Sequence, residues 1–429
     1  MKLYPHQESA LKRTAGFERV AFYHDMGLGK TFTGAQKMAQ YGNRVNLVIC
    51  QKSKANDWVN HFVEYGFERH FHMVYDCTKW KKDDWVALGE DPTAPCIMVI
   101  NYELAWRRRE LLKLKDFTLM LDESSLIQNK AAKQTKFILG LKPKNVILLS
   151  GTPTAGKYEN LWTQCHLLGW DISEDLYNRQ YVNWTTVESD GFFHKIVDKD
   201  NPYKNVERLK KKLREHGGDF VKTEEVFNLP EQTFTTVTVP TSKEYRRFMK
   251  ACYVQMPNGE ELIGDQVFSK RLYARQLCGM YSQAKLEAFE ELIQSTNDRV
   301  IVFYNFTDEA KALKAITQEC GKPFGTVNGA VKDLSAYDLY DDSVTFVQYQ
   351  AGAMGLNLQR ANKVIYFSLP ERSDLFEQSK KRIHRIGQEK PCFYWVMMCG
   401  KSVEEDIYQT LLERKDFTDE LFVERGKQR

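Results

Sequence analysis

The sequence lacks any apolar run long enough to cross a membrane, and it lacks closely spaced cysteine pairs. Its apolar runs are short, such as the four residues 146–149, against about 18 residues for a membrane helix. The nine cysteines are scattered without a CxxC pair, which argues against a disulfide framework or a zinc site. The first ten residues contain no apolar core of an export signal. These absences predict a soluble protein with reduced thiols.

Length and composition are those of an ordinary globular protein. The chain has 429 residues, which predicts two or three domains at about 150 residues each. Charged residues make up 28% and hydrophobic residues 42%. The net charge of +4 neither requires nor excludes nucleic acid, because a local basic groove suffices for binding. Basic clusters occur at 107–109, 208–214 and 380–385, and without other evidence a solvated helix face is the favoured interpretation of each.

Two stretches, 1–170 and 283–429, alternate short apolar strands with helical segments. This alternation predicts parallel α/β sheets. The region between them, 171–282, is polar and rich in aromatic residues, and we interpret it as insertions with a linker near 228–230. The expected strands are 20–23, 46–50, 97–100, 118–121, 145–149, 299–303, 324–327, 344–348, 363–367 and 393–397, and the expected helices include 56–65, 307–319, 374–385 and 403–412.

A glycine-rich segment, HDMGLGKT at 24–31, follows an expected strand and precedes an expected helix. That context is the one a P-loop requires, because glycines allow backbone N–H groups to point at phosphate oxygens. Lys30 would then reach the β- and γ-phosphates, and the Thr31 hydroxyl would hold Mg²⁺. His24 stands where the generic pattern has glycine, so only the short form GxGKT is matched.

Two adjacent carboxylates, Asp122 and Glu123, end the apolar strand in LMLDESS at 119–125. Ligands of open α/β sheets bind beyond the carboxyl ends of strands, so Asp122 is expected to face the Mg²⁺ held by Thr31. Glu123 is the natural general base or water-positioning group. The alternative is an acidic helix N-terminus without catalytic function, and the P-loop upstream favours the catalytic interpretation.

Nine segments in order along the chain resemble the motifs of helicase superfamily two, and more narrowly those of the Snf-type DNA translocases. The most specific is EQSKKRIHRIGQ at 377–388. The others are LYPHQ at 3–7, DMGLGKT at 25–31, LVICQKSKANDW at 47–58, VINYE at 99–103, LDES at 121–124, SGTPT at 150–154, RVIVFYNF at 299–306 and QAGAMGLNL at 350–358.

The resemblance implies an α/β fold of two RecA-like P-loop lobes with parallel sheets and helical insertions. The implied lobes are 1–228 and 229–429, with ATP and Mg²⁺ bound between them. The implied site residues are, for catalysis, Lys30, Glu123, Arg382 and Arg385; for nucleotide binding, Gln7, Met26, Gly27, Leu28, Gly29, Lys30, Thr31, Gly355 and Gln388; and for the metal, Thr31 and Asp122.

The chemistry of these side chains agrees with the implied roles. The Gln7 amide can pair with the N6/N7 edge of adenine. Arg382 and Arg385 are three residues apart, so in a helix they would share one face and act together as arginine fingers. Without the upstream motifs the same residues would be interpreted as a basic surface stripe.

Nucleic-acid contacts are expected on both lobes, although each candidate side chain could instead cap a loop. The candidates are Ser53, Lys54, Asn101, Tyr102, Asn305, Gln350 and Asn357. The chain departs from the family in three places. Ser125 stands where relatives carry histidine, 369–373 lacks the usual tryptophan-asparagine-proline, and the segment between 327 and 344 is short.

The resemblance therefore implies a monomeric, ATP-hydrolysing motor whose partner is nucleic acid, chiefly double-stranded DNA. A motor core of this kind suits the cytoplasm of a bacterial or phage-infected cell, or the nucleus of a eukaryote. Two alternatives remain open: a strand-separating DNA or RNA helicase of the same superfamily, and a nucleic-acid-binding scaffold with a vestigial ATP site. The sequence indicates neither a recruiting protein nor a direction of movement.

Overall fold

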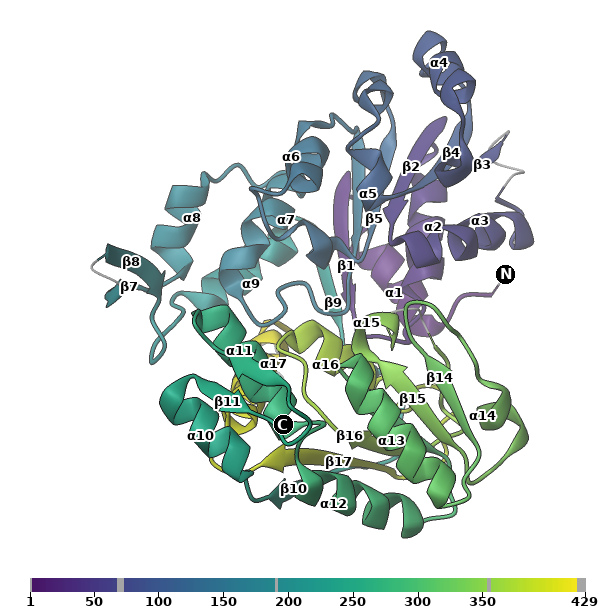
Figure 1. The fold of residues 1–429 in the computed structure, drawn as a ribbon. Coiled ribbons are helices and arrows are strands. Elements are labelled where there is room, and N and C mark those ends of the chain that lie inside the picture. Colours follow the sequence, from purple (N-terminus) through teal and green to yellow (C-terminus); the bar gives the residue numbers. More distant parts are fainter. Residues whose placement is uncertain (1, 68–72, 190–191, 353–355, 423–429) are drawn as a thin grey trace. The chain divides into compact units, whose positions relative to one another are not determined.

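The computed structural model describes residues 2–67, 73–189, 192–352 and 356–422. The chain divides into two compact units, built from Met1–Val226 and Phe227–Lys415, each around its own parallel sheet (Figure 1). Gly355, expected at the nucleotide site, lies outside the described residues. None of the helices in the described part combines the length and apolarity needed to cross a bilayer.

The first unit contains a seven-stranded parallel sheet in the order β3-β4-β2-β5-β6-β1-β9. The central strands are apolar and buried because helices cover both faces, as is usual for parallel sheets. The strands are β1 (Arg19–His24), β2 (Val45–Cys50), β3 (Val74–Asp76), β4 (Cys96–Asn101), β5 (Thr118–Asp122), β6 (Asn145–Leu149) and β9 (Gly218–Val221).

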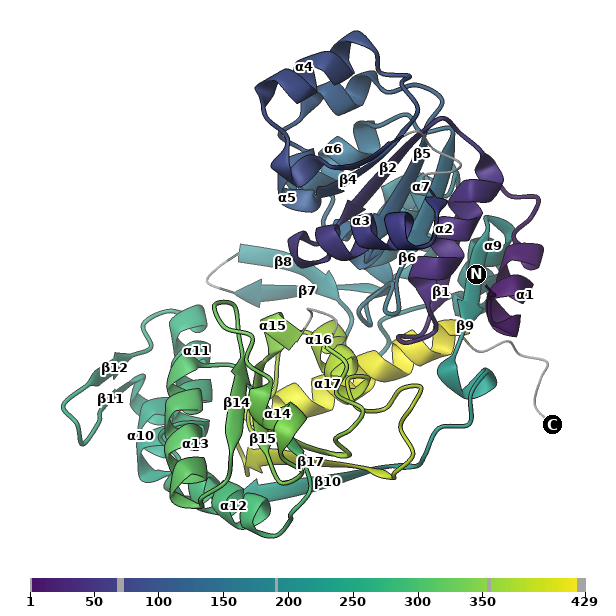
Figure 2. The same ribbon diagram turned by 90° about the vertical axis from the view of Figure 1, so that its right-hand side faces the viewer.

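Alternate side chains of these strands enter two separate cores, one on each face of the sheet. Val20 and Phe22 of β1 pack with α1 (Pro5–Arg13), α2 (Lys30–Tyr41) and α3 (Ala55–Glu64). Ala21 and Tyr23 pack on the opposite face. Figure 2 shows the ribbon after a 90° turn, with α2 and α3 beside the sheet of this unit. The helices of that face are α4 (Lys82–Glu90), α5 (Tyr102–Ala105), α6 (Lys133–Gly140), α7 (Trp162–Leu167), α8 (Glu174–Tyr181) and α9 (Val206–Glu215).

The second unit contains a six-stranded parallel sheet in the order β10-β17-β16-β13-β15-β14. Its strands are β10 (Gln232–Val239), β13 (Val300–Tyr304), β14 (Phe324–Val327), β15 (Val344–Gln348), β16 (Lys363–Tyr366) and β17 (Cys392–Cys399). Its helices are α10 (Lys243–Ala251), α11 (Val267–Cys278), α12 (Gln283–Gln294), α13 (Thr307–Glu319), α14 (Ser335–Leu339), α15 (Tyr349–Gly352) and α16 (Ser373–Lys380); α17 (Val403–Phe422) begins in this unit.

The region 171–282 contributes more regular structure than the sequence predicted. It supplies β9 to the first sheet and β10 to the second, besides two antiparallel hairpins. Neither strand is a compact apolar run, because β9 has only four residues and β10 (QTFTTVTV) is largely exposed. The hairpins pair β7 (Trp184–Ser189) with β8 (Phe192–Val197) and β11 (Tyr253–Gln255) with β12 (Glu261–Ile263).

Candidate functional site

The loop between β1 and α2 contains two glycines with left-handed backbone conformations. Gly27 and Gly29 have φ angles of 87° and 70°, in the left-handed region that favours glycine. A Cβ atom on Gly29 would lie 2.5 Å from Nε2 of Gln7, so a larger residue would also clash. The strand–loop–helix context predicted for this segment is therefore confirmed, and the N-terminus of α2 directs its amides at the loop.

Lys30, the first residue of α2, turns its ammonium group back onto the loop. Its Nζ donates hydrogen bonds to the backbone carbonyls of His24 at 2.9 Å and Asp25 at 3.2 Å. A Cβ on Gly151 would lie 3.4 Å from this Nζ and 3.1 Å from Cγ of Met26. The SGTPT segment after β6 therefore lies directly against the glycine-rich loop, with Thr31 next to Lys30 in the first turn of α2.

Gln7 braces the loop from α1. It is 2% exposed, and its Nε2 donates to the carbonyls of Leu28 and Gly29, both at 3.2 Å. Its Oε1 accepts from the backbone N–H of Tyr4 at 2.9 Å, which caps α1. His6 adds a contact of 2.9 Å from Nε2 to the Leu28 carbonyl. These bonds explain a structural role for Gln7, while adenine recognition stays a prediction.

Asp122 ends β5 on the sheet face that packs against α2 and α3, because Met120, two residues earlier, belongs to that core. Its Oδ2 accepts a hydrogen bond of 2.8 Å from Nε1 of Trp58, and its backbone carbonyl accepts one of 3.0 Å from the hydroxyl of Tyr102. Burial raises the pKa of Asp122, whereas the Trp58 bond and the charge of Lys30 act in the opposite direction. The carboxylate is thus fixed in place beside the loop.

Glu123 has a left-handed backbone, with φ 57° and ψ 61°, which is uncommon outside glycine. Its Oε1 accepts hydrogen bonds from the hydroxyls of Ser125 at 2.7 Å and Ser150 at 2.8 Å. Burial raises the pKa of Glu123, and the charge of Lys30 opposes that rise. Ser125, the departure noted in the sequence, therefore joins Ser150 in orienting the carboxylate.

A partly buried charge cluster beneath the loop had no clear signal in the sequence. His24 is fully buried, and its Nε2 lies 2.8 Å from Oδ2 of Asp219 on β9. Arg13 of α1 donates to both oxygens of the same carboxylate, at 2.6 Å and 2.9 Å. Burial raises the pKa of Asp219, but the bonds to His24 and Arg13 prevail and lower it to about 2. His24 in place of a glycine was the one visible hint of this arrangement.

The nucleic-acid candidates of the first unit divide into exposed and buried residues. Ser53 and Lys54 lie on the 3₁₀ turn η1 (Lys52–Lys54), where Ser53 is exposed and Lys54 pairs with Asp57 at 2.9 Å. Asn101 and Tyr102 are each 2% exposed. Neither buried side chain is displayed on the surface of the unit, and Tyr102 instead holds the end of β5.

Arg382 and Arg385 do not lie on a helix, so the predicted helix 374–385 is wrong at its C-terminal end. Helix α16 ends at Lys380. The carbonyl of Arg382 accepts a hydrogen bond of 3.1 Å from the backbone N–H of Leu358. The two arginines occupy successive turns instead, and Nη1 of Arg385 donates to Oδ1 of Asn357 and, at 3.5 Å, to the carbonyl of Leu356.

Gln388 fastens this arginine-bearing turn. It is buried, and its Nε2 donates to the carbonyls of Ala361 at 2.8 Å and Ile383 at 3.2 Å. Its Oε1 accepts from the N–H of Lys390 at 3.0 Å. His384 adds a contact of 2.9 Å to the carbonyl of Pro230. Gln388 therefore positions the turn, and a direct nucleotide contact stays a prediction.

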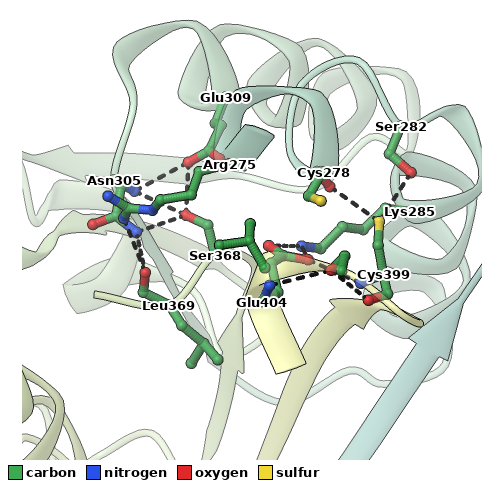
Figure 3. Close-up of polar contacts among 12 residues, drawn as sticks. Arg275, Cys278, Ser282, Lys285, Asn305, Glu309, Ser368, Leu369, Cys399 and Glu404 are labelled. Atoms are coloured by element: carbon green, nitrogen blue, oxygen red, sulfur yellow. Dashed lines mark hydrogen bonds and ion pairs between the residues drawn. The ribbon is translucent and has the colours of Figure 1, made fainter. Parts of the chain in front are cut away.

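Asn305 is likewise absorbed into a hydrogen-bond network, at the carboxyl end of β13 (Figure 3). Its Nδ2 donates to the hydroxyl of Ser368 and to the carbonyl of Leu369, both at 3.0 Å. Glu309 accepts from the same Ser368 hydroxyl at 2.8 Å. Asn357 and Gln350 of α15 are exposed, so they are the nucleic-acid candidates of this unit that the surface displays.

A second buried group lies beside this network (Figure 3). Within the described part of the chain, Cys278, Cys399 and Glu404 are the one trio whose ligand atoms all fall within 4.8 Å. Both carboxylate oxygens of Glu404, however, accept from Nζ of Lys285, at 2.6 Å and 2.8 Å. The ammonium already neutralises the carboxylate, so the group is a buried ion pair flanked by two thiols.

Comparisons with known proteins identify the family of the chain. Residues 9–292 match the family model of the SNF2-related domain, and residues 284–387 match that of the helicase conserved C-terminal domain. A Bacillus subtilis protein named as an ATP-dependent helicase/translocase, YwqA, is 24% identical over 98% of this chain and 48% of its own length. The ISWI chromatin-remodeling complex ATPase ISW1 of Saccharomyces cerevisiae is 21% identical over 94% of this chain and 38% of its own length.

One solved structure, the Sulfolobus solfataricus SWI2/SNF2 ATPase core in complex with dsDNA, is 20% identical with a TM-score of 0.45, covering 98% of this chain and 92% of its own. The chain spans less than half the length of the two curated relatives. The SNF2-related model alone covers more than half of the chain. The chain therefore belongs to the SNF2-related family of helicase superfamily two, and it carries that family's helicase C-terminal domain.

Proposed function

We propose that this protein is a motor that hydrolyses ATP to move along nucleic acid, with duplex DNA as its track. Family membership and the helicase/translocase name of the Bacillus relative support the proposal. The observation that carries it is the arrangement of Lys30, Asp122 and Glu123 around one glycine-rich loop. A cation beside the loop and two fixed carboxylates form the set that phosphoryl transfer to water requires.

Magnesium fits the residues at this site. Mg²⁺ prefers oxygen ligands and is usually held by one or two protein groups together with substrate phosphates and water. The Asp122 carboxylate and the Thr31 hydroxyl are such groups, and Trp58 occupies only Oδ2 of Asp122. When bound, the ion would neutralise charge on the β- and γ-phosphate oxygens.

In the proposed reaction, Lys30 exchanges the carbonyls of His24 and Asp25 for phosphate oxygens of ATP. Glu123 then orients the attacking water and accepts its proton. Ser125 and Ser150 hold Oε1 of Glu123, which leaves Oε2 to face that water. Because the pKa of Glu123 is raised by burial, its carboxylate is a better proton acceptor than an exposed one.

The second unit would supply the arginines. We place Arg382 and Arg385 against the γ-phosphate when the two units close on ATP, with Gln388 keeping their turn in shape. Hydrolysis would release these contacts, and each cycle of closing and opening would advance the protein along the phosphate backbone. Ser53, Lys54, Gln350 and Asn357 are the proposed backbone contacts, because they are displayed at the surface or partly so.

The related proposal, a helicase that separates strands, uses the same ATP hydrolysis. It differs only in whether movement along the duplex also unwinds it. Displacement of a triplex-forming strand from intact duplex DNA reports translocation, whereas a forked duplex reports unwinding. We expect displacement without unwinding. We also propose that the protein acts as a monomer in the compartment that holds its DNA, the cytoplasm of a bacterial or phage-infected cell.

The first test compares ATP hydrolysis with single-stranded DNA, duplex DNA and RNA at one salt concentration, because backbone binding depends strongly on salt. Glu123→Gln should keep nucleotide affinity and lower stimulated turnover by about 10²–10⁴-fold. Glu90→Gln, an exposed residue at the end of α4, is the matched control and should behave as wild type.

Absence of hydrolysis with every polynucleotide would instead favour a binding scaffold with a vestigial ATP site. Wild-type turnover in Glu123→Gln would remove that residue from its proposed role.

A further inference from the structure

Asp122 is held by two aromatic side chains, and both come from segments that were expected to face nucleic acid. Trp58 belongs to LVICQKSKANDW and bonds the Asp122 carboxylate at 2.8 Å. Tyr102 belongs to VINYE and bonds the Asp122 backbone carbonyl at 3.0 Å. The metal ligand is therefore in direct contact with both segments, although neither aromatic side chain reaches the surface.

The connection from the surface to Trp58 is short and stiff. The exposed turn η1 (Lys52–Lys54) runs without a break into α3 (Ala55–Glu64), so Lys54 and Trp58 are separated by one helical turn. The indole is clamped by ring contacts with His61 at 5.9 Å and Phe62 at 5.5 Å between centroids. A displacement of the turn is thus transmitted to the indole by a packed helix.

Tyr102 holds the backbone of Asp122 from the second segment. Tyr102 is the first residue of α5 and follows Asn101, the last residue of β4. Its hydroxyl donates to the Asp122 carbonyl at 3.0 Å. The Asn101 side chain in turn donates to Glu103 at 2.6 Å, which orders the surface of this segment.

We propose that Trp58 is a positioning residue that transmits nucleic-acid binding to the proposed metal ligand Asp122, and that Tyr102 positions the backbone of the same residue. Nucleic acid held at Ser53 and Lys54 fixes the turn, the turn fixes α3, and the indole N–H then fixes the carboxylate oxygen that does not face the metal. Second partners of this kind orient metal-bound carboxylates elsewhere. The inference rests on the proposed function, and it assigns the means by which the nucleic acid would stimulate that function.

The test removes one hydrogen bond at a time and keeps the packing. Trp58→Phe deletes the indole N–H, and Tyr102→Phe deletes the hydroxyl. Trp85→Phe and Tyr181→Phe are the matched controls, because both side chains are buried in the same unit and their polar atoms have no hydrogen-bond partner in the described structure. Thermal unfolding of each variant checks that the fold is kept.

The first measurement is independent of turnover. Binding of a fluorescent ADP analogue is titrated with and without Mg²⁺, and the ratio of the two affinities is the readout. We expect Trp58→Phe to lower that ratio by about tenfold, as for loss of a hydrogen bond to a charged group. An unchanged ratio in a variant with wild-type Tm would overturn the positioning role.

The second measurement is the stimulation of ATP hydrolysis by a linear duplex DNA, expressed as stimulated over basal rate. Both test variants should lose most of this ratio, and the double variant should lose little more, because the two bonds act on one residue. The controls should keep it. Equal losses of stimulation in test and control variants would show that altered packing, and not the missing hydrogen bond, causes the loss.

Failure of the underlying function gives a different pattern. If none of the polynucleotides makes the wild-type protein hydrolyse ATP, the proposed function is wrong. The transmission of nucleic-acid binding to Asp122 is then wrong as well. The magnesium-dependent affinity ratio still separates Trp58→Phe from Trp85→Phe in that case, and so decides the positioning role by itself.

Discussion

In the first unit the charged motif side chains interact electrostatically with one another, whereas in the second unit the polar motif residues are held mainly by hydrogen bonds to backbone atoms. The positive charge of Lys30 favours the ionised forms of Asp122 and Glu123, and two serine hydroxyls donate hydrogen bonds to Glu123. Gln388 and Asn305 instead bond carbonyls of neighbouring loops. This difference fits our proposal that the first unit carries out the chemistry and that the second supplies two arginines from a braced turn.

Removal of an arginine is expected to have the largest effect on this comparison. Arg385→Ala should lower stimulated ATP turnover by about 10³-fold or more and leave nucleotide binding by the first unit largely intact. Arg385→Lys should recover little of the loss, because lysine lacks the planar fork of donors. Steady-state ATPase kinetics and nucleotide titration are the measurements.

Arg360→Ala is the matched control, since Arg360 is about half exposed and pairs with Asp338 at 3.6 Å. Equal losses of ATP turnover in the two alanine variants would show that the turn at 381–388 has no specific role in hydrolysis.

The buried ion pair of the second unit provides a large effect on stability. Glu404→Gln would leave Lys285, which is fully buried, without its counter-charge, and should cost about 3–5 kcal/mol of unfolding free energy. Urea denaturation measures the loss. The double replacement Lys285→Met with Glu404→Leu should restore much of it, because removing both charges leaves no unpaired one. If the double variant is as unstable as the single, packing and not charge governs this site.

The charge cluster of the first unit should have a smaller effect that depends on pH. The pKa of Asp219 is lowered to about 2 in the folded protein, against about 3.9 unfolded. Its contribution, about 2 kcal/mol, is therefore present above pH 4 and is lost as the pH falls toward 2. Asp219→Asn should lose this stability at pH 7 and converge with wild type near pH 2. A constant difference across that range would exclude ionisation as the cause.

The sequence predicted much of the fold because most strands are compact apolar runs. Three expected strands, 145–149, 324–327 and 344–348, coincide with β6, β14 and β15. Strands β9 and β10 were missed, since a short glycine-containing strand and an exposed threonine-rich edge strand carry no such signal.

The nucleotide loop was predictable for a related reason, because its residues are consecutive and its glycines have a fixed geometric purpose. The bonds that hold Asp122 and Glu123 were not. Trp58 and Asp122 are 64 residues apart, and no local pattern encodes their pairing. The end of α16 at Lys380 was also missed, because the segment that follows contains no glycine or proline before Gly387 to mark it.

The contact between His24 and Asp219 has a consequence for how the protein is made. The two residues are 195 positions apart, so the strand that underpins the phosphate loop is synthesised long after the loop itself. At about 5–20 residues per second, a nascent chain would carry the unsupported loop for roughly 10–40 seconds. Truncated chains that end before 218 should therefore fail to retain nucleotide, even though every residue of the glycine-rich segment is present.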